Sequence, residues 1–328
     1  AARGGADGHE RRGRGRARGA VPQLMPAATS PPPAIAPDGA ELEARLEAHR
    51  GGLTRKYRVR NAEQLLRMVD ELGFCFAFTL RPGDAPLPAG FDHLSTNDEG
   101  RKWGWMWEWK DQLAADRRLY YGTLLVRKPT FVSLRLLPAF YATFGRAGEP
   151  DDHLDDVRAG RLSDISRRII DFLGASGETQ TKRMRAALGI VSKEGKRDYD
   201  KAIDEVQRLM YVARVRAVGE GREDYNYTYD LFVRRYPEAA KAAERIASAD
   251  ATRLLLERSL ELAGAITARQ LERLFEWGED RTRRTVERVE AAGGLVRTAR
   301  RRDVLLVLPS LLRSRSAKEQ DGHGAAVP

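Results

Sequence analysis

Side chains that could bind or hydrolyse a ligand are concentrated in residues 103–111. The run WGWMWEW places four of the chain's five tryptophans at every second position, and two carboxylates, Glu108 and Asp111, lie within it or just after it. A carboxylate against an aromatic wall can have its pKa raised, as a general acid requires. Glu108 and Asp111 are therefore the candidate catalytic residues. Both also lie close to Lys110, so a plain salt bridge is the simpler expectation.

The tryptophan run itself has the period of a β-strand. Strict alternation over seven residues predicts that Trp103, Trp105, Trp107 and Trp109 share one face of a strand. Four indole rings are a large apolar area, so most of that face is expected in the core. One edge of the ladder, at Trp103, is the candidate for stacking on an unpaired base.

The elements around this run predict an α+β fold that is predominantly helical. From residue 162 onward, one pattern occurs twice: a helix, a short helix, a long helix and a two-stranded hairpin. This is the order of a winged helix, a variant of the helix-turn-helix. The expected organisation is a disordered Arg/Gly/Pro-rich tail with a short charged helix from Asp38 to His49 (1–56), an N-terminal α+β domain (57–160), a winged helix (161–236), a connecting helix and a winged helix (237–310), and a disordered tail (311–328).

Positive charge points to a polyanionic partner. The chain has 57 Lys and Arg against 47 Asp and Glu, a net charge of +10, which suits double-stranded DNA. The third helix of the second copy places arginines three and four residues apart on one face. The residues expected to bind DNA there are Arg281, Arg283, Arg284, Arg288, Arg297, Arg300, Arg301 and Arg302. The first copy mixes acids with its cations and is expected to be mainly architectural, contacting the DNA backbone at most through Lys182, Arg183, Arg185, Lys196 and Arg197.

Several classes of protein are disfavoured by composition. A single cysteine, Cys75, excludes an internal disulfide and a cysteine-based zinc site, and the five histidines are scattered. We therefore expect no metal and no cofactor. No apolar run approaches the length that a bilayer needs, which predicts a soluble, cytoplasmic protein without a membrane partner. No heptad seam is visible, so a monomer is expected.

Four sequence blocks resemble the AlkZ-related branch of the AlkZ-like (YcaQ-like) winged-helix family. They are GFCFAF, WEWKDQL, YYGTLLVRKPTFVSLRLLPAFYA and YDLFVRRYPE, and the resemblance extends over residues 60–308. It implies three winged-helix units in tandem around a basic concave channel, with the first, divergent unit inside 57–160. The best-known members are DNA glycosylases that unhook interstrand crosslinks, which implies a role in DNA repair and a damaged duplex as partner.

The catalytic motif of those glycosylases is absent. They carry Gln-x-Gln or Gln-x-Asp after the first helix, where the side chains position the attacking water. The matching segment here is Gly73 to Phe78, and neither motif occurs in the chain. Phenylalanine and alanine can neither orient a water nor stabilise an oxocarbenium-like transition state. We therefore expect a DNA-binding protein whose catalysis does not follow from the resemblance.

Three alternatives remain open. The first is an active DNA glycosylase with relocated catalytic residues. The second is a winged-helix transcriptional regulator, which would bind paired half-sites as a dimer. The third is a protein-interaction scaffold, which gains support if the arginines of the last copy are paired with acids inside the fold.

Overall fold

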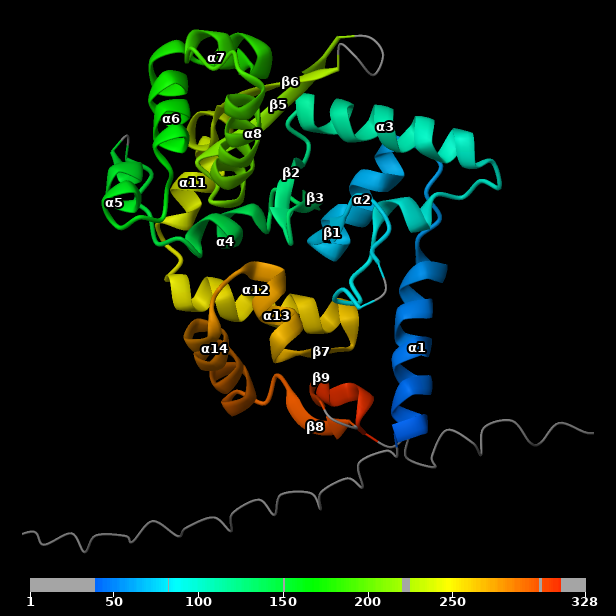
Figure 1. The fold of residues 1–328 in the computed structure, drawn as a ribbon. Coiled ribbons are helices and arrows are strands. Elements are labelled where there is room, and N and C mark those ends of the chain that lie inside the picture. Colours follow the sequence, from blue (N-terminus) through cyan, green and yellow to red (C-terminus); the bar gives the residue numbers. More distant parts are fainter. Residues whose placement is uncertain (1–38, 82, 150, 220–224, 301–302, 314–328) are drawn as a thin grey trace, which may run out of the picture. The chain divides into compact units, whose positions relative to one another are not determined.

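The computed structural model describes residues 39–81, 83–149, 151–219, 225–300 and 303–313, which form helices and three small antiparallel sheets (Figure 1). The predicted α+β class, mainly helical, is confirmed. Both predicted tails fall largely outside the described residues. Within the described helices, none combines the length and the apolarity that crossing a membrane requires.

The first unit begins with an amphipathic helix. The Asn61 side chain accepts a hydrogen bond from the Gln64 N–H at 2.9 Å, which caps α2 at its start. The helix ends at Gly73, whose φ of 80° is easy only for glycine. The elements of this unit are α2 (Ala62–Leu72), β1 (Phe74–Phe76), the 3-10 helix η1 (Gly90–His93), α3 (Glu99–Ala115), β2 (Tyr120–Leu125) and β3 (Lys128–Val132).

The strand predicted for the tryptophan run is wrong, because the run lies inside helix α3. Asp98 caps the helix by accepting a hydrogen bond from the Arg101 N–H. Met106, Trp109 and Leu113 recur at helical spacing and are buried. Alternation at every second residue also contains pairs four residues apart, and in a helix such pairs are neighbours. The four tryptophans therefore divide into two pairs instead of sharing one face.

The middle and last units match the predicted helix patterns closely. Short helices α4 (Leu137–Ala142) and α5 (Asp152–Arg158) precede the middle unit, and α10 (Phe232–Arg235) and α11 (Pro237–Ala243) connect it to the last. The middle unit consists of α6 (Asp164–Ser176), β4 (Thr179–Gln180), α7 (Thr181–Ala187), α8 (Lys193–Arg208), β5 (Val212–Val218) and β6 (Asn226–Leu231). The last unit consists of α12 (Ser248–Ala263), β7 (Ala265–Thr267), α13 (Ala268–Phe275), α14 (Glu279–Ala291), β8 (Val296–Arg300) and β9 (Asp303–Val307).

All three sheets have the same topology. In each unit the short strand after the first helix pairs antiparallel with the second strand of the hairpin, which gives the orders β1-β3-β2, β4-β6-β5 and β7-β9-β8. The middle unit has a hydrophobic core of its own, built around Leu173, Tyr199 and Val206. The first and last units contribute to one larger core.

The helix predicted from Asp38 to His49 is longer than expected and is packed into the fold. Helix α1 (Gly39–Lys56, blue in Figure 1) buries Leu42 and Leu46 against strands β7 and β9 of the last unit. His49 and Arg50 bond the carbonyls of Glu261 and Ala263 at the end of α12. The 3-10 helix η2 (Pro309–Leu311) follows β9 and lies beside the same helix.

Candidate nucleic-acid interface

Six of the arginines predicted to bind DNA in the last unit lie in the described part of the chain, and most of these are held by acids of the same fold. Four of them form ion pairs, at the following N–O distances: Arg283 with Asp280 (3.1 Å), Arg288 with Asp250 (3.2 Å), Arg297 with Glu290 (2.9 Å) and Arg300 with Glu43 (2.8 Å). These pairs reduce the positive charge that the unit presents to a polyanion.

The remaining arginines of this set differ in their surroundings. Arg281 is half-buried and donates to the carbonyl oxygen of Thr143 and to Ser248 Oγ, the latter at 2.7 Å. Burial lowers the pKa of Arg281, and the nearby Arg284 lowers it further. Arg284 itself is exposed, without an ion pair or hydrogen bond to the described part of the chain. Arg301 and Arg302 lie outside the described residues.

The outward face of α14 alternates in sign. Val286 and Val289 are buried, and on the opposite side of the helix lie Asp280, Arg284 and Glu287. Side chains four and three residues apart lie in one row along a helix, so the charges along this row are negative, positive and negative. Such a row has a weak field beyond the helix surface.

The middle unit presents a different row on its third helix. Lys193, Arg197 and Lys201 follow one another at intervals of four residues on α8, opposite the buried Tyr199 and Val206. Lys201 is paired with Asp198 at 3.0 Å, and Lys196, beside the row, with Asp200 at 2.6 Å.

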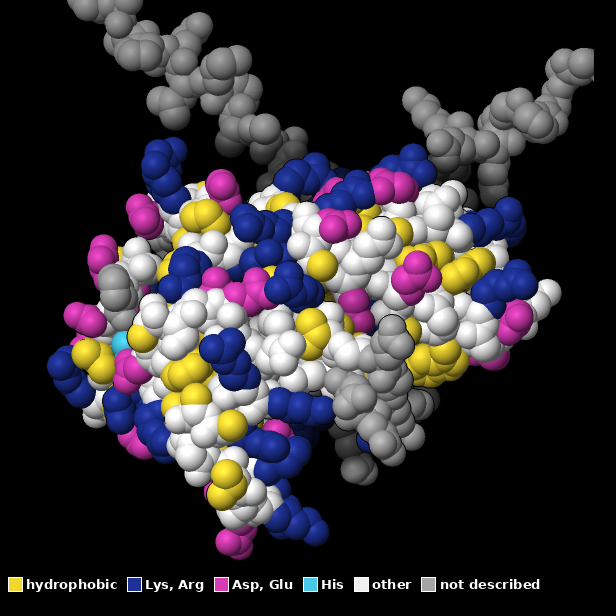
Figure 2. Space-filling model, turned by 90° about the horizontal axis from the view of Figure 1, so that it is seen from above, with side chains coloured by type: hydrophobic (Ala, Val, Ile, Leu, Met, Phe, Trp, Pro, Cys, Tyr) yellow, Lys and Arg dark blue, Asp and Glu magenta, His cyan; other side chains and the backbone are white. Residues whose placement is uncertain are grey.

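Four cations of the middle unit have no such partner. Lys193, Arg183, Arg185 and Arg197 form no side-chain hydrogen bond or ion pair with any residue that the structure describes. They come from α7 and from the first turns of α8. Figure 2 shows the molecule from above, the side on which α7 lies in Figure 1, and on this face Lys and Arg side chains are interspersed with Asp and Glu. Lys193 was not predicted, although its spacing of four from Arg197 is a signal that could have found it.

The third helix of the first unit is aromatic. Trp103 and Trp107 are 51% and 48% exposed and line an open pocket of about 1090 Å³ together with Glu108, Asp111 and residues of the β5–β6 hairpin, namely Ala217, Gly219 and Tyr225. On another side of α3, the Trp105 and Trp109 rings stack at 5.1 Å, and Trp109 is buried. Trp103 is thus exposed, as its candidacy for stacking requires, whereas the expectation that the other rings lie in the core is wrong for Trp107.

A buried lysine joins α3 to the middle unit. The side chain of Lys110 is fully buried and its Nζ lies 2.7 Å from Asp111 Oδ1, so the salt bridge expected at Asp111 is confirmed. Lys110 also donates to the Tyr225 hydroxyl, which donates to Asp111 Oδ2 at 2.5 Å. Burial lowers the pKa of Lys110, while Asp111 opposes that shift. Both carboxylate oxygens of Asp111 are thus engaged, one by Lys110 and the other by Tyr225.

Glu108 differs from Asp111 in being exposed, with no ion pair to the described residues. Glu108 lies open to solvent at the pocket and is not enclosed by an apolar wall. Within the described ranges, no three His, Cys, Asp or Glu side chains are close enough together to hold a metal ion.

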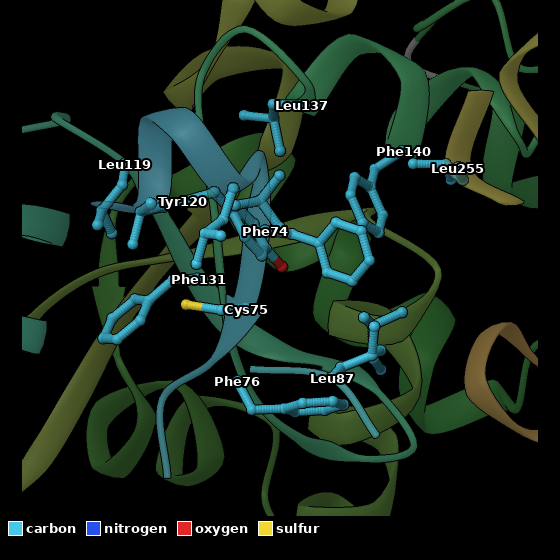
Figure 3. Close-up of a cluster of buried hydrophobic side chains, with 14 of the residues drawn as sticks. Phe74, Cys75, Phe76, Leu87, Leu119, Tyr120, Phe131, Leu137, Phe140 and Leu255 are labelled. Atoms are coloured by element: carbon cyan, nitrogen blue, oxygen red, sulfur yellow. The ribbon is translucent and has the colours of Figure 1, made fainter. Parts of the chain in front are cut away.

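The segment expected from the resemblance to correspond to the glycosylase motif is part of the core. Phe74, Cys75 and Phe76 form β1 and are at most 1% exposed, packed among Leu119, Phe131 and other apolar side chains (Figure 3). Burial raises the pKa of the Cys75 thiol to about 12, so the thiol stays protonated at neutral pH. This strand offers a water neither access nor a polar side chain.

Comparison with known proteins agrees with this architecture. No curated protein sequence matches the chain. The structure resembles that of the Streptomyces sahachiroi DNA glycosylase AlkZ with a TM-score of 0.53 and 12% sequence identity, over 84% of this chain and 71% of that one. At this identity the likeness is one of fold. The sequence model of the family described as AlkZ related matches residues 59–276, and the chain therefore belongs to the AlkZ-related family.

Proposed function

We propose that the chain is a DNA-binding protein made of three winged-helix units in tandem, acting in DNA repair or the response to damage. The repeated order of helix, short strand, helices and hairpin supports the winged-helix assignment, because each sheet places its short strand beside the second hairpin strand. Family membership and the fold shared with a DNA glycosylase support DNA as the partner.

The observation that carries this proposal is the set of unpartnered cations on α7 and α8. In a winged helix the third helix enters the major groove, and its first turns lie closest to the DNA. Lys193 and Arg197 occupy those turns, with Arg183 and Arg185 on the preceding helix. The partial positive charge at the start of α8 adds to their attraction for phosphate.

The last unit is proposed as a secondary contact. Exposed ion pairs are worth only about 0.2–1 kcal/mol, so a phosphate can displace the carboxylate from an arginine. The displaced carboxylate remains nearby and repels the same phosphate, however, which leaves little net gain. Among the arginines of α14, we propose Arg284 as the principal contact.

We further propose that the chain does not excise bases by the arrangement of the characterised glycosylases. Their water-positioning side chains have no counterpart in the buried strand β1. Of the relocated candidates, Asp111 is tied to Lys110 and Tyr225, and Glu108 is exposed. Trp103, at the pocket, is the proposed contact to an unstacked base.

A second candidate function is a protein-interaction scaffold, which the ion pairs of Arg283, Arg288, Arg297 and Arg300 favour. The two candidates differ in their response to salt. Release of counterions gives DNA binding a log–log salt slope of about −0.9 per phosphate contact. Titrating a labelled duplex at increasing salt should therefore give a slope of about −3 or steeper. Absence of binding at low salt would reject the DNA proposal and leave the scaffold.

Catalysis is tested separately. The chain would be incubated with duplexes that carry alkylated or crosslinked bases, followed by alkaline cleavage to reveal abasic sites. We expect no product above a protein-free control. Formation of abasic sites would overturn the proposed loss of activity, and loss of that product in Glu108→Gln would then identify the relocated acid.

A further inference from the structure

The pocket between α3 and the β5–β6 hairpin exposes two aromatic rings whose positions are set by the fold. Trp103 packs on Phe78 and Phe91, with ring centroids 5.5 and 4.7 Å apart, and still leaves about half of its surface exposed. The Trp107 ring lies 5.2 Å from the Tyr225 ring and 4.1 Å from Lys110 Nζ. Exposed rings held this rigidly offer a preorganised surface for a planar ligand.

The charge of the pocket determines whether it attracts a positively or a negatively charged ligand. The described residues lining it include two carboxylates, Glu108 and Asp111, and no cation. Lys110 lies behind Trp107, and its charge is balanced by Asp111 at 2.7 Å. Glu108 is the charge that remains without a partner among the described residues. A phosphate or carboxylate ligand would be repelled there.

We propose that this pocket binds a planar organic cation, which stacks on Trp103 and places its positive charge near Glu108. Stacking on an indole ring is favourable for any planar heterocycle, and a positive charge adds a cation–π attraction, which is strongest for tryptophan. A volume of about 1090 Å³ accommodates a ring system of two or three fused rings. The cation is either a free molecule or a charged heterocycle within a nucleic-acid strand, and only the second source rests on the proposed DNA binding.

A matched pair of probes tests the charge requirement. N-methylquinolinium is a planar cation, and quinoline is its neutral counterpart at pH 8. Binding is measured on the full chain by quenching of tryptophan fluorescence and by calorimetry. We expect the cation to bind at least tenfold more tightly than quinoline. Equal affinity for the two probes would overturn the proposal.

Two variants test the site, and a third serves as control. Trp103→Ala should weaken binding of N-methylquinolinium at least tenfold, and Glu108→Gln about threefold or more. Glu279→Gln removes an exposed carboxylate of the same charge from α14 and should leave the affinity unchanged. A thermal unfolding curve shows whether Trp103→Ala is folded. If it is not, the affinity of Glu108→Gln decides whether the pocket binds the cation, because Glu108 is exposed and its replacement should not disturb folding. Unchanged affinity in every folded pocket variant would overturn the proposal.

The source of the cation is distinguished by competition. An oligonucleotide with one positively charged N-methylated purine and its unmodified counterpart are each added to the bound probe. Displacement of the probe by the modified strand alone supports the proposal and identifies a charged base as the ligand. Displacement by neither strand supports the proposal and indicates that the ligand is a free molecule. Displacement by both strands equally would contradict the requirement for charge. Duplex affinity measured in the same variants should not change with Glu108→Gln, so failure here leaves the DNA-binding proposal intact.

Discussion

Helices α8 and α14 are the third helices of the middle and last units, and they differ in where their acids lie. Residues 181–201 contain seven Lys and Arg with three acids, and residues 279–300 contain six with four. The larger difference is in position. At the same spacing of four and then three residues, the exposed row of α8 is Lys193, Arg197 and Asp200, whereas that of α14 is Asp280, Arg284 and Glu287. Surface charge therefore depends on where acids lie relative to the buried face, more than on the number of arginines.

The start of each helix shows a physical reason for the difference. Helix α14 begins with Glu279 and Asp280, and acids in the first turn stabilise a helix through its dipole. Helix α8 has a single acid, Glu194, in its first turn, and it is capped by Ser192, which accepts a hydrogen bond from the Gly195 N–H at 3.0 Å. Because the first turns of a recognition helix are also the ones that approach DNA, acids there improve helix stability at the expense of phosphate binding.

The largest effect is expected from reversing charge on α8. The double variant Lys193→Glu, Arg197→Glu should lower affinity for duplex DNA ten- to a hundredfold at low salt. It should also reduce the magnitude of the log–log salt slope by about 2, since each phosphate contact contributes about 1. Fluorescence anisotropy with a labelled duplex measures both quantities. An affinity within twofold of the unaltered chain would remove α8 from the interface.

A smaller effect is expected from the matched change on α14. Arg284→Glu with Arg288→Glu alters the same number of charges, but Arg288 is already neutralised by Asp250. Affinity should therefore fall only about threefold, because one free cation is lost. If this variant weakened binding as much as the α8 variant does, the contrast between the two helices would be broken.

The smallest effect is an expected gain. Asp280→Asn with Glu287→Gln frees Arg283 from both of its carboxylates, which should raise duplex affinity about two- to threefold. Loss of Asp280 from the first turn should cost about 0.3–1 kcal/mol of helix stability. The same titration and a thermal unfolding curve measure the two changes. A fall in affinity would contradict the competition inferred between helix stability and phosphate binding.

The sequence predicted the middle and last units well because their buried positions repeat at helical spacing. Ile169, Ile170 and Leu173 on α6 are buried, as their periodicity requires. The ion pairs of α14 could not be predicted in the same way. Asp250, which neutralises Arg288, is 38 positions away in the sequence and belongs to α12. Glu43, which neutralises Arg300, belongs to α1. Only the folded chain brings them together.

The tryptophan run was mispredicted because its spacing fits two periods. Alternation satisfies a strand, but residues four apart in the same run are neighbours on a helix. The signals that decide between the two lie beside the run: the cap at Asp98 and the apolar positions Met106, Trp109 and Leu113. The pocket could not be predicted, since Tyr225 reaches it from a hairpin more than a hundred residues later.

Helix α1 has a consequence for how the chain is made. Its Arg45 donates to the carbonyl of Leu311, 266 positions later, and its Leu42 and Leu46 are covered by strands of the last unit. At a synthesis rate of about 5–20 residues per second, this helix waits roughly 15–50 s for its packing surface to leave the ribosome. During that interval its leucines have no native partner. The beginning of the described chain is therefore among the last parts to reach its final place.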